Sequence, residues 1–145
     1  MKQPVHMKTK IISKILVSLG LVFVLGSAIT QVHSEEEKLP VITIHSTGDV
    51  TRGKTGSFVL NMNPVLFGGM YVNFSVGGTA IPGVDYVHLV SPAHIGQSGY
   101  GVILVQTLPN RRAPALQSYS VVVTLEPGPG YAVGEPKSAQ MMIKP

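Results

Sequence analysis

One stretch of the sequence matches a phosphate-binding motif. Residues 48–55 read G-D-V-T-R-G-K-T, which fits the G-x-x-x-x-G-K-[ST] pattern of nucleotide-binding loops. That chemistry needs a helix starting at the lysine, because the free N–H groups and the dipole of the helix face the phosphates. The sequence continues instead as an alternation typical of a strand and then reaches Pro64. We therefore interpret the match as a turn and predict no nucleotide site.

Residues suited to hydrolytic or metal chemistry are few. After residue 34 the chain has three histidines and two aspartates: His45, His88, His94, Asp49 and Asp85. Neither a G-x-S-x-G elbow nor an H-E-x-x-H helix is present in the sequence. His88 and His94 could together bind a metal, but their separation is not a recognised ligand spacing, and two isolated surface histidines are the simpler interpretation. We predict that the protein is not an enzyme and that it has no cofactor.

The tyrosines offer a different chemistry. An exposed tyrosine presents a flat apolar ring with a polar tip, so several together could bind a sugar or a peptide. The alternative for Tyr86 and Tyr119 is half-buried packing, as in the corner tyrosines of β-sandwiches. The candidates for a binding face are Tyr71, Tyr86, Tyr100, Tyr119 and Tyr131.

The elements that position these residues are organised around residues 71–86, Y-V-N-F-S-V-G-G-T-A-I-P-G-V-D-Y. The first six residues alternate, with Val72, Phe74 and Val76 on one face, as expected of a strand with one buried side. A glycine pair follows and tolerates positive φ, and a Pro-Gly pair gives a second turn. The stretch therefore predicts a strand that ends in a corner closed by Asp85 and Tyr86.

The same stretch resembles a known family. The pattern V-x-F-S-x-G-G-T-A-x-x-G-x-D-Y is similar to the signature of Calx-beta domains, and a looser similarity extends over residues 41–143. The resemblance implies a secreted or surface-exposed, immunoglobulin-like antiparallel sandwich, which in many members binds calcium at one end.

The resemblance also implies where calcium would bind. In the family the ligands come from an acidic residue after the first strand, from the Asp of G-x-D-Y, and from an acidic cluster after the strand that corresponds to residues 102–108. Asp85 matches the second position, but Arg52 lies near the first, and Asn110, Arg111 and Arg112 occupy the third. Our hypothesis is that an ion pair of Asp85 with Arg52, Arg111 or Arg112 replaces the metal. Two alternatives remain: Asp85 caps its own turn, or a reduced calcium site uses Asp85, Asn110 and backbone carbonyls.

The first 34 residues predict export. Lys2, Lys8, Lys10 and Lys14 precede an uncharged apolar run at residues 15–29, and small or compact residues precede Glu35, so we interpret residues 1–34 as a signal peptide. A retained membrane anchor is the alternative, since residues 15–32 approach the length that spans a bilayer. In both cases the rest of the chain lies outside the cytoplasmic membrane, in the periplasm, at the cell surface or in the extracellular space. Residues 35–39 form a polar leader.

Charge and cysteine content bear on which classes of function are possible. The chain has 11 basic and 7 acidic residues, but four of the lysines lie in residues 1–34, so the remainder is formally neutral. The high isoelectric point therefore gives no support for nucleic-acid binding. The sequence has no cysteine, which excludes disulfides and thiol chemistry.

Alternating segments separated by turn residues predict an all-β, immunoglobulin-like antiparallel sandwich of about seven strands over residues 40–145. We expect residues 40–46 at a sheet edge, residues 102–108 covered on both sides at their start, and residues 119–125 in the centre of a sheet. The remaining strands are expected at residues 57–62, 71–76, 87–90 and 139–143.

These features together favour an exported, non-catalytic binding module whose partner is a protein or a surface glycan. The loop at residues 109–114 and an open sheet edge near Val41 are the expected binding elements. Membrane contact is expected only through an uncleaved N-terminal segment. A calcium-binding module with a reduced site around Asp85 is the alternative.

Overall fold

The computed structural model describes residues 38–109, 112 and 117–145, which belong to one compact unit, Glu37–Pro145. The predicted signal segment and most of the predicted leader lie outside the described residues. Ten strands form two sheets, and no helix occurs in the described part of the chain. Among those residues, then, no helix has the length and apolar character needed to cross a membrane.

The larger sheet has the strand order β4-β6-β7-β3-β1-β9. All neighbouring strands in it are antiparallel except β1 and β9. Its strands are β1 (Val41–Ser46), β3 (Thr55–Asn63), β4 (Met70–Val72), β6 (Ala93–Ile95), β7 (Tyr100–Gln106) and β9 (Ala132–Val133).

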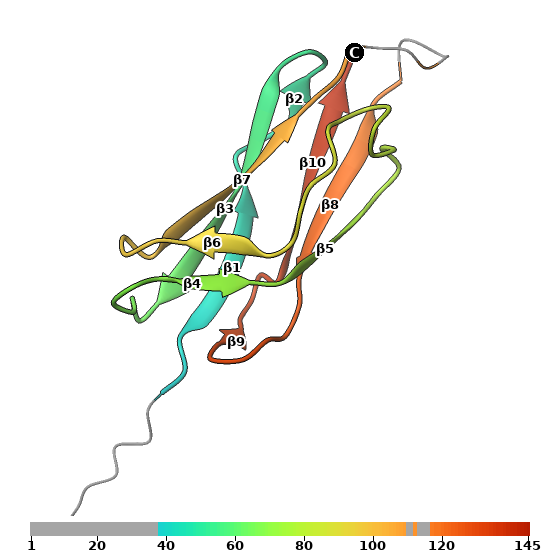
Figure 1. Cartoon of the computed structure of the whole chain (residues 1–145). Helices are drawn as coiled ribbons and strands as arrows, with labels where there is room; N and C mark the ends of the chain where they lie inside the picture. The colour runs from blue at the N-terminus through green and yellow to red at the C-terminus, as the bar shows by residue number, and fades with distance from the viewer. Residues whose placement is uncertain (1–37, 110–111, 113–116) are drawn as a thin grey trace, which may run out of the picture. The chain divides into compact units, whose positions relative to one another are not determined.

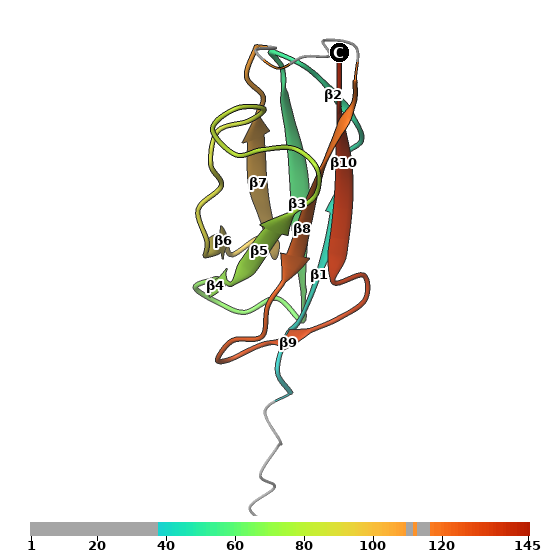
Figure 2. The ribbon, with the colours of Figure 1, turned by 90° about the vertical axis from the view of Figure 1, so that its right-hand side faces the viewer.

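The smaller sheet has the order β2-β10-β8-β5, and β2 pairs with β10 in parallel. Figure 1 shows β7 and β3 beside β10 and β8, and the turned view in Figure 2 confirms two packed layers. The predicted sandwich is therefore confirmed, as is the central place of residues 119–125. The strands of this sheet are β2 (Val50–Thr51), β5 (Phe74–Gly77), β8 (Tyr119–Leu125) and β10 (Ser138–Lys144).

The core lies between the sheets and follows the alternation in the sequence. In β3 every second side chain from Phe58 to Met62 is buried, and in β8 the same holds from Tyr119 to Leu125. Each large apolar side chain removed from water contributes about 1.5 to 3 kcal/mol. The period of two in these segments is thus the main determinant of the fold.

The predicted strand at residues 71–76 changes sheets in its middle. Its first part is β4, which pairs with β6 in the larger sheet, and its second part is β5, which pairs with β8 in the smaller one. Asn73 lies at the crossing, where its N–H donates to the Tyr131 hydroxyl at 3.0 Å. Val72 and Phe74 still both face the core, so the alternation continues unbroken across the change of sheet.

Three of the detailed predictions were wrong. Residues 87–90 form no strand, and the pairing segment is β6 instead. The start of β7 is not covered on both sides, because Val102 and Leu104 are 54% and 63% exposed. The short strands β2, β6 and β9, together with the division of residues 71–76, raise the number of strands from about seven to ten.

The edge of β1 near Val41 is not open. Val41 pairs with Ala132 of β9, and the Gly134 and Ile44 N–H groups continue the contact with the carbonyls of Ile42 and Pro136. The expectation of an open edge at this place was therefore wrong. A segment that follows the β8 strand satisfies the backbone groups that an incoming strand would need.

The motif at residues 48–55 lies in a turn region. Gly48 and Gly53 both have positive φ, and Thr55 begins β3, so a strand occupies the place where a phosphate-binding helix would start. The structure therefore lacks the element on which that chemistry depends.

Candidate functional site

Asp85 lies at the end of the glycine corner and is completely buried. Its Oδ2 atom accepts a hydrogen bond from the Ile81 N–H at 2.7 Å, and its own N–H donates to the Ile81 carbonyl at 2.8 Å. The Asp85 carbonyl in turn accepts from the Leu108 N–H, just after β7. The carboxylate therefore caps its own turn, while the backbone joins this turn to the neighbouring strand.

Two arginines contact the same carboxylate. Arg52, which follows β2, places Nη2 3.0 Å from Asp85 Oδ1, and Arg112, which follows β7, places Nη2 3.4 Å from Oδ2. The ion pair and the turn cap, which the sequence left as alternatives, are thus both present. Among the described residues, Arg52 and Arg112 are brought to Asp85, whereas Asn110 and Arg111 lie outside the described part of the chain.

The Tyr119 ring lies against both guanidinium groups. The Cζ atom of Arg112 is 3.6 Å from the ring centroid, and that of Arg52 is 5.3 Å from it. A planar guanidinium stacks well on an aromatic face, and this attraction grows when both groups are removed from water. Tyr119 is itself buried, so it fixes the two cations over Asp85.

The donor set around Asp85 does not fit calcium. Calcium requires six to eight oxygen ligands. Here both carboxylate oxygens of Asp85 already contact cationic side chains. Within the described residues, no group of three or more His, Cys, Asp or Glu side chains could hold a metal ion. Arg52 Nε and Nη1 are buried and have no hydrogen-bond partner in the same part of the chain, so the site also holds donors, which cannot bind a cation.

Tyr86, next to Asp85, and Tyr119 both belong to the core, so the packing role expected of them is confirmed, but they are buried and not half-buried. Burial raises the pKa of the Tyr86 hydroxyl above its ordinary value of 10.0, and the negative charge of Asp85 raises it further. Both effects disfavour the phenolate. Tyr131 is also buried, and its hydroxyl donates to the Glu126 carbonyl at 2.7 Å.

The histidines singled out by the sequence are exposed. His88 lies in the loop before β6, and His94 lies on β6, where its ring is 5.0 Å from the Tyr71 ring. Tyr71 and His94 are paired across β4 and β6, so the ring contact follows from the strand register.

The outer face of the larger sheet is a second candidate site. Tyr71 and Tyr100 are the exposed tyrosines of the chain, and Val102 and Leu104 extend the same face along β7. The outward side chains of β1, β3, β4, β6 and β7 include no Lys, Arg, Asp or Glu. We call this surface the uncharged face. Sequence reasoning named its tyrosines but missed Val102 and Leu104, because their apolar run suggested burial on both sides.

Several solved structures resemble the fold, among them the three that follow. The calcium-binding domain CBD12 of CALX1.1 matches with a TM-score of 0.55, 15% identity and coverage of 70% of this chain. CBD12 from CALX1.2 gives a TM-score of 0.54, 15% identity and 70% coverage. The apo form of the Calx CBD1 domain gives a TM-score of 0.52, 16% identity and 74% coverage, with 97% of that domain matched.

The resemblance to Calx-beta domains is confirmed for the fold. This chain spans only 43% of the two CBD12 structures, which are longer than one such domain. No family model matches the sequence, and no curated protein matches it. At this level of identity, the likeness extends to the arrangement of strands and no further.

Proposed function

We propose that the chain is an exported, non-catalytic β-sandwich module that binds a protein or a surface glycan at the cell surface or in the periplasm. The uncharged face carries the proposal. Exposed aromatic and aliphatic side chains gather there without any charged residue, although the rest of the described surface carries charges of both signs. A contiguous apolar surface of this kind marks an interaction site in a soluble domain. Export rests on the pattern of residues 1–34.

The face has the composition of a binding surface. Val59, Val102 and Leu104 supply its apolar part, with Val102 opposite Val59 across β7 and β3. The two exposed tyrosines and several amide, hydroxyl and imidazole groups surround them. An apolar centre with a polar surround and few charges is typical of recognition sites.

A calcium-responsive module is the second candidate, because one structural neighbour, CBD12 of CALX1.1, is described as a calcium-binding domain. The two arginines at Asp85 weigh against it. A site with a Kd of about 10 µM would add about 2.7 kcal/mol at about 1 mM calcium. We expect no rise in the melting temperature of the protein with calcium relative to a chelator, and a clear rise would favour the calcium module instead.

The binding proposal is tested with two valine variants. The full chain is expressed with a C-terminal tag, and retention of the recovered protein by the envelope fraction of the producing organism is measured. We expect retention of the wild type and a loss of at least about tenfold for Val102→Glu, because a buried unpaired charge costs more than about 1.4 kcal/mol. Val90→Glu is the matched control, since Val90 is 80% exposed and lies in a loop outside the sheet.

Two results would contradict the proposal: no retention of the wild type, or equal retention of wild type and Val102→Glu. The same preparations test export. The intact mass of the recovered protein distinguishes a chain that begins at Glu35 from one that still carries residues 1–34, and recovery of the protein from the cytoplasm alone would argue against export.

A further inference from the structure

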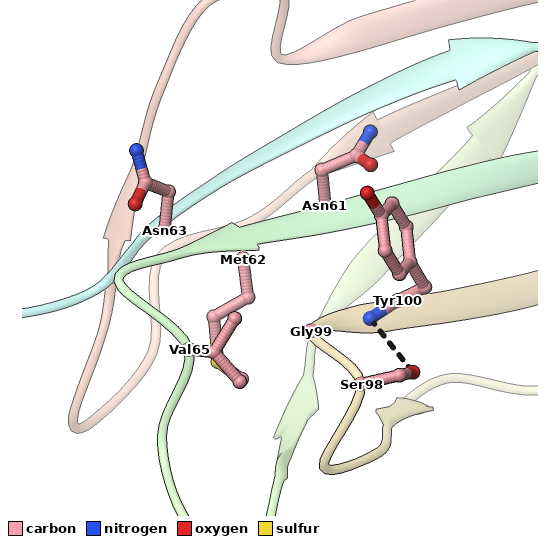
Figure 3. Close-up of a pocket in the computed structure, with 7 residues that line it drawn as sticks. All are labelled: Asn61, Met62, Asn63, Val65, Ser98, Gly99 and Tyr100. Carbon is pink, nitrogen blue, oxygen red and sulfur yellow. Dashed lines mark hydrogen bonds between the residues drawn. The ribbon is translucent and has the colours of Figure 1, made fainter.

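A cavity of about 280 Å³ opens where β3 ends and β7 begins, at one end of the uncharged face (Figure 3). The tight turn at residues 96–99 creates it. Gly99 has a φ of +79°, and its carbonyl accepts from the Met62 N–H at 2.8 Å, which joins the turn to β3. A Cβ atom at Gly99 would lie 2.5 Å from Val65 Cγ2, so a glycine is needed for this close approach. The lining residues are Asn61, Met62, Asn63, Val65, Ser98, Gly99 and Tyr100.

Two side-chain amides of β3, those of Asn61 and Asn63, line the cavity. Asn61 and Asn63 are two residues apart on a strand, so both side chains leave the same face, about 7 Å apart. The Asn61 Nδ2 atom lies 3.1 Å from His45 Nδ1, which leaves its carbonyl oxygen available as an acceptor. Within the described part of the chain, the Asn63 amide has no hydrogen-bond partner and offers both a donor and an acceptor.

The Tyr100 ring completes the lining. Tyr100 is opposite Asn61 across β7 and β3, and Figure 3 shows its ring standing on the same side of β3 as the Asn61 amide. The ring is exposed, with the residue 60% accessible, and the Tyr100 N–H donates to Ser98 Oγ at 3.4 Å. The cavity thus combines one flat aromatic surface with amide and hydroxyl groups, all of them uncharged.

This chemistry favours a sugar over a peptide. A sugar ring presents an apolar C–H face, which packs on an aromatic ring, and hydroxyl groups that both donate to and accept from amides. The cavity volume is just below the range of about 300 to 1,000 Å³ that is usual for ligand sites, so it suits a single ring. A protein partner would need about 800 Å² of contact on this side, far more than the cavity offers.

We infer that the cavity formed by Asn61, Asn63, Ser98 and Tyr100 binds one residue of a neutral sugar chain, which continues along the uncharged face. This inference rests on the proposed function and specifies its partner as a glycan. Tyr100 provides the stacking surface, and the two asparagines orient the hydroxyl groups. The absence of charged side chains on the face selects against acidic sugars, which would lose their hydration without gaining a cationic partner.

The test uses the protein that is recovered when the full chain is expressed. Maltotetraose, cellotetraose, mannotetraose and tetra-N-acetylchitotetraose serve as neutral probes, with tetragalacturonate as the acidic probe. Binding is measured by titration of the backbone and side-chain amide NMR signals. We expect saturable binding of at least one neutral probe, with the largest shifts at Asn63, Gly99 and Tyr100, and no binding of tetragalacturonate.

Two variants locate the site. Tyr100→Ala should weaken binding about tenfold or more, because an aromatic contact contributes about 0.5 to 1.5 kcal/mol beyond its buried area. Phe67→Ala is the control: Phe67 is an aromatic residue, 97% exposed, that lies in the loop before β4, outside both the cavity lining and the uncharged face, so its removal should change affinity less than about twofold. Asn63→Ala should also weaken binding while leaving the amide spectrum of the fold unchanged.

The inference is overturned if no neutral probe shifts the cavity signals, or if Phe67→Ala and Tyr100→Ala weaken binding equally. The proposed function would survive that result if the envelope fraction still retains the wild type but not Val102→Glu, and a protein partner would then be indicated. Loss of envelope retention in the wild type would instead remove the proposed function itself.

Discussion

The two ends of strands β3 and β7 hold opposite kinds of polar chemistry. At the Asp85 end, a fully buried anion lies beside the buried cation of Arg52 and the partly buried cation of Arg112, and the carboxylate contacts three donors. At the cavity end, uncharged amides and a tyrosine ring face solvent, and one amide lacks a partner in the described chain. At the Asp85 end the polar groups bind one another and stabilise the fold. At the cavity end the polar groups face solvent, so they are available to a ligand.

The largest expected effect is at the Asp85 end. Asp85→Asn leaves the guanidinium of Arg52 buried without its counter-charge, and removing one partner of a buried ion pair costs about 3 to 5 kcal/mol. Urea denaturation would measure this loss of unfolding free energy. Asp49→Asn is the control, because the Asp49–Lys144 pair, 2.8 Å apart, is exposed and should matter far less. Equal losses in the two variants would contradict the proposed contrast between buried and exposed charge.

The glycine corner gives the next largest effect. Gly78 has a φ of +104°, and an added Cβ would lie 2.3 Å from the Ser120 carbonyl oxygen, so Gly78→Ala should destabilise the fold by about 2 to 3 kcal/mol. Gly77→Ala is the neighbouring control, since a Cβ there meets nothing within 4 Å. Thermal melting of both variants would compare them. A similar loss in Gly77→Ala would contradict this explanation, because the loss would then not depend on the clash with Ser120.

Alkaline pH should lower the unfolding free energy through Tyr86, at the Asp85 end. The folded state raises the pKa of Tyr86 above 10.0, so the folded protein keeps a proton that the unfolded chain releases. Its contribution is fully present below pH 10 and is lost as the pH rises through the higher folded pKa. We expect the unfolding free energy to fall more steeply between pH 9 and about pH 11 in the wild type than in Tyr86→Phe. Parallel pH profiles would argue against this assignment.

The cavity end should show the smallest change in stability. Tyr100→Ala and Asn63→Ala alter exposed side chains and should shift the unfolding free energy by no more than about 0.5 kcal/mol. Ile103→Ala, at a buried position of the same strand β7, should cost about 2 to 5 kcal/mol. A loss above 2 kcal/mol in Tyr100→Ala would show that this residue serves packing and would weaken its assignment to a ligand.

Much of the fold could be predicted because alternation reports directly on burial. The periods of β3 and β8 and the glycine corner are local signals, and each corresponds to the structure. The crossing at Asn73 left no such signal, since the chain changes sheets while Val72 and Phe74 keep facing the same core. A local pattern cannot distinguish which sheet a strand joins when both sheets bury the same face.

The sites were predictable to different degrees. The pairing of Asp85 with arginine could be anticipated because arginines stand near the positions where the resemblance implies acidic calcium ligands, yet the sequence could not select Arg112 from its neighbours. The outer side of β7 could not be predicted, because V-I-L-V suits a strand covered on one side or on both. The cavity depends on the approach of the turn at residues 96–99 to the end of β3, which is a tertiary contact without a local pattern.

The places where β1 begins and β10 ends have a mechanical consequence. β1 begins beside Asn63, whereas β10 ends beside Thr51, at the opposite end of the sandwich. Tension applied to the two termini would therefore pull along the strands and load many hydrogen bonds of β1 and β10 in shear at once, instead of opening them one after another. A module built in this way resists being pulled apart along the direction of its strands.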